Sequence, residues 1–77
     1  MGNVMTFTPE RSSQIQRATY DPDTLYLQVT FANNSSYTYA GVPSHVFAAM
    51  MRWSSPGAYF HTVIKRHYKV VEKAKTV

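Results

Sequence analysis

The residues able to do metal chemistry are few in this sequence. There is no cysteine, and the three histidines are His45, His61 and His67. A zinc site needs three or four ligands that converge on one point, whereas His61 and His67 lie six residues apart and would face different sides of a helix. We therefore expect no metal site, an exposed His61, and a His67 that packs at the edge of the core.

Catalytic groups are equally sparse. The chain has only four acidic residues, and Asp21 and Asp23 flank a proline in a predicted turn, where solvation and turn capping account for them. The sequence contains no Gly-x-Ser-x-Gly elbow, and its three glycines do not form a phosphate-binding loop. The residue types thus predict a protein that is not an enzyme and that uses no cofactor.

The chemistry that remains is that of binding. The net charge is +4, and all lysine and arginine residues except Arg11 and Arg17 lie from Arg52 onward, opposed only by Glu72. A basic C-terminal third suits an anionic partner, either nucleic acid or an acidic protein surface. A solvated tail that keeps a small protein soluble explains the same charges equally well.

Length and composition predict one small domain. The chain has 77 residues, of which 44% are hydrophobic, 14% aromatic and only 16% charged, a composition typical of globular rather than disordered proteins. No apolar run approaches the roughly 18 residues of a membrane span, and residues 1–10 contain no signal-peptide core. We expect a cytoplasmic monomer that does not enter a membrane.

Three strands are predicted in the first half of the chain. Residues 15–20 form the first strand, and a turn at 21–24 leads to the clearest one, 25–31, in which apolar and polar residues alternate. Asn33-Asn34-Ser35 is a hairpin turn, because asparagine tolerates a positive φ. Residues 36–40 are the third strand.

Two helices follow the strands. Ser44 is placed to cap a helix that runs to about Trp53, a residue we expect in the core, and Ser55 with Pro56 begins the second helix. The predicted fold class is α+β, a three-stranded antiparallel β-meander followed by two short α-helices packed on one face. The predicted organisation is a flexible lead-in (1–12), a single domain (13–68) and a basic tail (69–77).

Several short motifs follow one another along the chain at characteristic spacings. They are Tyr20-Asp21, Leu27 to Phe31, Tyr37-Thr38-Tyr39, Val42-Pro43, Ser55-Pro56-Gly57, Tyr59-Phe60, Ile64 and Tyr68. Over about residues 13–68 this series resembles the KTSC domain, a module named for its occurrence at the C-terminus of some lysyl-tRNA synthetases. The resemblance implies RNA binding, by association with the synthetase, and no catalytic residues. Family members also occur as free-standing proteins of bacteria and phages.

Two functions remain open. In one, Tyr26, Tyr37 and Tyr39 form a solvent-side platform on which bases of RNA or another single strand stack, with basic side chains on the phosphates. For the pair Tyr37 and Tyr39 we favour packing under the helices instead.

In the other, which we favour slightly, the chain is a small phage-type transcription regulator that binds bacterial RNA polymerase. The sequence lacks the arginine-rich or glycine-aromatic signature of a dedicated RNA reader, and phages make small proteins that bind this host enzyme. The residues predicted to bind a partner are Arg17, Tyr26, Tyr37, Tyr39, Arg52, Lys65, Arg66, Lys69 and Lys73.

Overall fold

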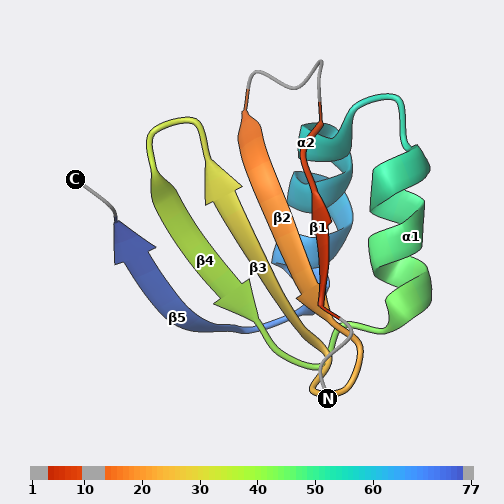
Figure 1. The fold of residues 1–77 in the computed structure, drawn as a ribbon. Coiled ribbons are helices and arrows are strands. Elements are labelled where there is room, and N and C mark those ends of the chain that lie inside the picture. Colours follow the sequence, from red (N-terminus) through yellow and green to blue (C-terminus); the bar gives the residue numbers. More distant parts are fainter. Residues whose placement is uncertain (1–3, 10–13, 76–77) are drawn as a thin grey trace.

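The computed structural model describes residues 4–9 and 14–75, and within them five strands and two helical segments form an α+β domain. The five strands make one antiparallel sheet in the order of the sequence, and the helices cover one face of it (Figure 1). The elements are β1 (Met5–Phe7), β2 (Ile15–Asp21), β3 (Tyr26–Phe31), β4 (Ser35–Tyr39), α1 (Ser44–Arg52), α2 (Pro56–Tyr59), the π-helical turn η1 (Phe60–Ile64), α3 (Lys65–His67) and β5 (Val70–Lys75).

Strand alternation decides which face of the sheet meets the helices. On β3, Leu27 and Val29 are fully buried, and their neighbours along the strand point to the other face. Leu27 lies opposite Tyr39 and Val29 opposite Tyr37 on β4. Both tyrosines therefore lie on the helix-covered face, and the prediction that the helices pack on one face of the sheet is confirmed.

The two predicted turns between the central strands use side-chain and backbone hydrogen bonds. The backbone N–H of Asp23 donates to Oδ1 of Asp21 at 2.9 Å, and Asn34 takes a positive φ of 67° in the hairpin. Leu25 also has a positive φ, of 64°, which extended backbone does not allow. β3 consequently begins at Tyr26 rather than at the predicted residue 25.

The predicted count of three strands is wrong, because β1 and β5 add one strand to each edge. On β1, Met5 pairs with Tyr20 of β2; on β5, Lys73 pairs with Tyr37 of β4. Residues 70–74 are all exposed, so the sequence of β5 has no alternation of buried apolar and exposed polar residues. The strand is defined by its backbone pairing with β4. The predicted lead-in lies partly outside the described residues, and its described part contains β1.

The helix starts follow the sequence in one case and depart from it in the other. Ser55 caps α2 as predicted, its Oγ accepting the N–H of Ala58 at 3.4 Å, with Pro56 in the first turn. The predicted Ser44 cap is wrong: Pro43 holds the N-cap position in extended backbone, which makes Ser44 the first helical residue.

Two side chains expected in or beside the core are exposed. Trp53 is 54% exposed, because α1 ends at Arg52 and the backbone turns to an extended conformation at Trp53. His67 is also exposed. The π-helical turn before it adds a residue to the helical repeat and changes which side the following residues face.

Candidate functional site

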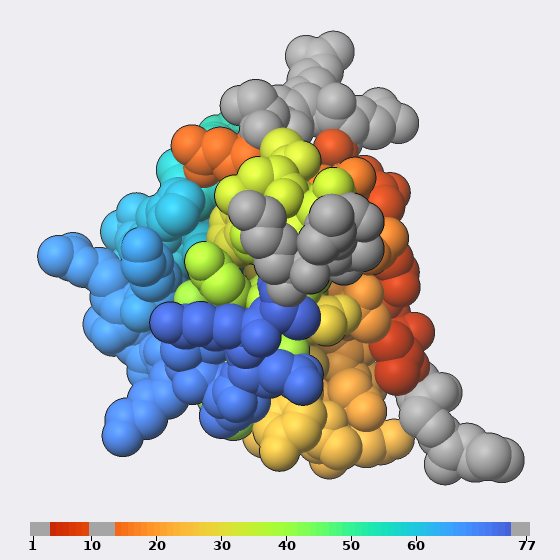
Figure 2. Space-filling view, turned by 90° about the vertical axis from the view of Figure 1, so that its left-hand side faces the viewer, coloured from red at the N-terminus to blue at the C-terminus, as the bar shows by residue number. Residues whose placement is uncertain are grey.

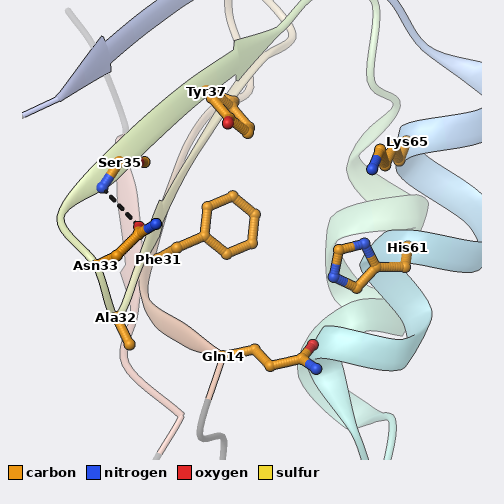
Figure 3. Close-up of a pocket in the computed structure, with 8 residues that line it drawn as sticks. All are labelled: Gln14, Phe31, Ala32, Asn33, Ser35, Tyr37, His61 and Lys65. Carbon is orange, nitrogen blue, oxygen red and sulfur yellow. Dashed lines mark hydrogen bonds between the residues drawn. The ribbon is translucent and has the colours of Figure 1, made fainter.

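A groove opens where the second helical segment leaves the sheet partly uncovered. Its first hollow has a volume of about 400 Å³ and is shown in Figure 3. It is lined by Gln14, Phe31, Ala32, Asn33, Ser35, Tyr37, His61 and Lys65. A second hollow of about 340 Å³ is lined by Tyr37, Tyr39, Lys65, Tyr68, Val70 and Lys73. The two hollows adjoin at Tyr37 and Lys65, and together we call them the sheet–helix groove.

The strands supply one wall of the groove and the helical segment the other. Phe31 ends β3 and Tyr37 is central in β4, while His61 lies in the π-helical turn and Lys65 begins α3. In Figure 3 the imidazole of His61 and the ammonium of Lys65 point from the helix toward Phe31 and Tyr37. The groove thus brings together aromatic rings from the sheet with an imidazole and an ammonium group from the helix.

Two rings form the floor of the first hollow. The ring centroids of Phe31 and His61 lie 6.3 Å apart with 22° between their planes, and Figure 3 shows the rings side by side with their faces turned the same way. Both rings contact Phe60 nearly at right angles, with interplanar angles of 70° and 75°. Phe60 is buried, so it supports both rings from the core side.

The charge of the groove is positive. Lys65 and Lys73 line it, and no Asp or Glu is found among its lining residues within the described chain. Asp21 ends β2 and Asp23 lies in the turn after it. Glu72 pairs with Thr38, whose side chain points away from the helices. In Figure 2 the blue side chains of α3 and β5 project beside the yellow-green surface of β4.

Polar side chains form the rim near the β3–β4 hairpin. Oδ1 of Asn33 accepts the backbone N–H of Ser35 at 3.1 Å, which fixes the amide so that its NH₂ group faces the hollow in Figure 3. Gln14 lies against Gly57 at the start of α2: a Cβ added to Gly57 would come within 2.5 Å of Oε1 of Gln14. The glycine of this turn therefore gives Gln14 room at the groove wall.

Tyr39 belongs to the core beneath the second hollow. It is 4% exposed, and its ring meets Phe60 edge-on at a centroid distance of 5.4 Å. Burial, with a smaller contribution from Tyr37, raises the pKa of Tyr39 above its usual value. This phenol therefore stays neutral and acts as packing rather than as a charged ligand contact.

The structure brings together only some of the residues predicted to bind a partner. Tyr37, Tyr39, Lys65 and Lys73 line the groove. Tyr26 is 49% exposed but alternates with Leu27 to the face away from the helices, so the three tyrosines do not form one platform. The other predicted residues, all exposed and none lining the groove, are Arg17 on β2, Arg52 at the end of α1, Arg66 on α3 and Lys69 after it.

The most distinctive residues of the groove were not predicted as binding residues. Phe31 has the pattern of a core residue, and His61 that of an exposed helical one. Their proximity depends on the long-range approach of β3 to the π-helical turn, which no local pattern encodes. One local pattern could have indicated part of the groove. His61 and Lys65 are four residues apart, directly after the aromatic pair Tyr59-Phe60, and residues at this spacing lie on the same face of a helix.

Comparison with known proteins agrees with the series of motifs. The KTSC domain profile matches residues 11–68, most of the chain. The chain belongs to the KTSC domain family. Every residue of the first hollow lies within this KTSC match, whereas Val70 and Lys73 of the second hollow lie beyond it.

Two bacterial proteins and one solved structure are similar to most of this chain. A protein of Stutzerimonas stutzeri is 35% identical over 60 residues, covering 77% of this chain and 84% of its own length. A protein of Tsukamurella paurometabola is 32% identical over 63 residues, covering 82% and 94%. The crystal structure of a KTSC domain protein from Yersinia pestis is similar with a TM-score of 0.78 and 30% identity, covering 96% of this chain and 99% of that one.

The described residues contain no group of three or more His, Asp or Glu side chains placed to hold a metal ion. In the same residues, no helix has the length and apolar character needed to span a membrane.

Proposed function

We propose that this KTSC domain is a binding module that makes and breaks no covalent bond, and that its sheet–helix groove binds single-stranded nucleic acid. The observation that carries the proposal is the combination of an aromatic floor, Phe31 with His61, and flanking lysines in a groove with no acidic lining residue in the described chain.

The chemistry of a single strand matches this combination. Exposed bases stack on aromatic side chains, each stacked base contributing about 1–3 kcal/mol, while lysines contact the phosphates between them. The first hollow, at about 400 Å³, falls within the roughly 300–1,000 Å³ of typical ligand sites. An acidic protein surface would satisfy the lysines, whereas a single strand supplies phosphates for the lysines and a planar base at every position for the ring faces.

The test is a titration of labelled RNA and DNA oligonucleotides into the protein at several salt concentrations. For a single strand, the logarithm of affinity should fall with the logarithm of salt by about 0.7 for each phosphate contacted. Replacing Lys65 and Lys73 by alanine should weaken binding and flatten this slope, whereas Arg17→Ala, on another face, should leave both unchanged. Absence of binding by either oligonucleotide at low salt would reject the proposal.

A second candidate function is docking on the transcription machinery, with bacterial RNA polymerase as the partner. It is favoured by a separate surface at the end of α1, where Trp53 and Met51 are exposed and Arg52 lies between them in sequence. The Trp53 ring packs on Tyr59 at 5.1 Å and borders an apolar hollow of about 170 Å³. Tryptophan and arginine are favoured anchors of protein interfaces.

Purified RNA polymerase separates the second candidate from the first. If the polymerase is the partner, Trp53→Ala should weaken its binding strongly while the Lys65 and Lys73 substitutions change it little. Failure of immobilised polymerase to bind the unaltered protein at micromolar concentration would remove this candidate and leave nucleic-acid binding untouched.

A further inference from the structure

The two-ring floor of the first hollow is held in place by the core. Phe31 contacts the buried Phe60 edge-on at 5.2 Å and Tyr37 at 5.5 Å. His61 contacts Phe60 edge-on at 5.3 Å. Because the buried Phe60 contacts both rings, Phe31 and His61 lie side by side without a bound ligand. A preformed surface of this kind loses little conformational entropy when a planar group stacks on it.

The π-helical turn places the cation beside the floor. The N–H of Lys65 bonds to the carbonyl of Phe60, five residues earlier, rather than to that of His61. In this wider turn His61 and Lys65, which are four residues apart, both line the first hollow. π-helical turns are rare and occur frequently at functional sites.

The opposite rim offers hydrogen-bonding groups that can meet the edge of a base. The NH₂ group of Asn33 faces the hollow, because its Oδ1 accepts the N–H of Ser35. An amide donor of this type pairs with a base carbonyl or ring nitrogen. The hollow thus has a floor of two aromatic rings, an amide on one side and an ammonium on the other.

We infer that the first hollow is a subsite for one nucleotide, whose base lies on the rings of Phe31 and His61 while its phosphate meets Lys65. The inference rests on the proposed function, since it names where one unit of a bound strand is held. A free mononucleotide has the same base and phosphate groups as one unit of a strand. The experiment therefore tests an oligonucleotide and a mononucleotide separately.

The experiment measures binding of a short RNA oligonucleotide and of a mononucleotide to variants of His61. His61→Ala removes one ring and should weaken oligonucleotide binding about fivefold or more, the effect expected for one stacked base. His61→Tyr restores a ring and should recover the affinity. His67→Ala is the matched control, because His67 is also exposed on this helical segment but does not line the hollow.

Proton NMR supplies a readout independent of affinity. A base stacked on the floor should shift the ring resonances of Phe31 and His61 through its ring current, and should leave those of His67 and Trp53 in place. Circular dichroism of each variant confirms that an affinity change does not arise from loss of the fold.

The outcomes separate the subsite from the proposed function. If the oligonucleotide binds and the lysine substitutions weaken it, but His61→Ala has no effect and the floor resonances do not move, the subsite is wrong and the proposed function stands. If the mononucleotide alone binds with these shifts, the subsite is supported and strand binding is rejected. If neither ligand binds at low salt, both fail.

Discussion

The two ends of the aromatic core differ in how completely the helices close over the sheet. At the α1 end, Tyr20 stacks on Phe47 with ring centroids 5.0 Å apart, and both side chains are buried. At the end beside the π-helical turn, Phe31 and Tyr37 are only partly buried and border the groove. Similar residue types therefore seal the core at one end and remain accessible at the other.

The difference follows from how each helix meets the sheet. The hydroxyl of Tyr20 donates to the carbonyl of Val42 at 2.6 Å, which ties β2 to the segment that leads into α1. On the other side, the π-helical turn directs His61 and Lys65 toward the sheet without filling the space above Phe31. We therefore expect substitutions at the α1 end to change stability, and substitutions at the groove end to change binding.

The largest effect is expected for Tyr20→Ala. Removing a fully buried aromatic side chain costs about 3–5 kcal/mol, which is much of the total stability of a small domain, so this variant should be largely unfolded. Tyr37→Ala, at the partly buried end, should remain folded with a smaller loss. Urea unfolding followed by circular dichroism measures the free energy of unfolding of both variants. Equal losses at the two positions would contradict the expectation that the α1 end contributes more to stability than the groove end.

An intermediate effect is expected for Gly57→Ala, because the new methyl group would collide with the side-chain oxygen of Gln14. Overpacking of this kind costs typically 1–3 kcal/mol, and the roughly 1 kcal/mol by which alanine is favoured over glycine in a helix offsets part of this cost. The resulting shift of Gln14 should alter the groove wall. Ala58→Gly, at the exposed neighbouring position in α2, is the control; it should destabilise the domain without changing ligand affinity.

The sequence predicted the strands and helix starts that depend on local patterns of residues. The alternation in residues 25–31 predicted β3, and Ser55 with Pro56 predicted the start of the second helix, because buried alternation and capping chemistry are local. The edge strands β1 and β5 were missed, since exposed side chains carry no such pattern. The groove was missed as a unit because the contact between Phe31 and His61 depends on tertiary packing around Phe60.

Raising the pH tests the buried phenols of the core, Tyr20 and Tyr39, without a substitution. Burial, together with the nearby Asp21 carboxylate, raises the pKa of Tyr20 above its usual value of 10.0, and burial raises that of Tyr39 in the same direction. The folded state therefore holds these protons more tightly than the unfolded state. Their contribution to stability should be complete below about pH 10 and should be lost as the pH rises through the folded-state pKa values.

Thermal unfolding measured at a series of alkaline pH values, with phenolate absorbance recorded in parallel, follows this loss. Tyr20→Phe should unfold with a weaker pH dependence, because one of the two shifted phenols is gone. A wild-type stability that stays constant while all tyrosines ionise would show that the phenol at the sealed end reaches solvent.

The smallest effect is expected for Tyr26→Ala, on the sheet face opposite the helices. This side chain is about half exposed, and exposed substitutions away from caps and buried groups usually change stability by within about 0.5 kcal/mol. Since Tyr26 does not line the groove, oligonucleotide affinity and its salt dependence should match those of the unaltered protein. Weaker binding by this variant would instead place the ligand on the open face, where Tyr26 and Arg17 lie, and would remove the reason for assigning binding to the partly covered end of the core.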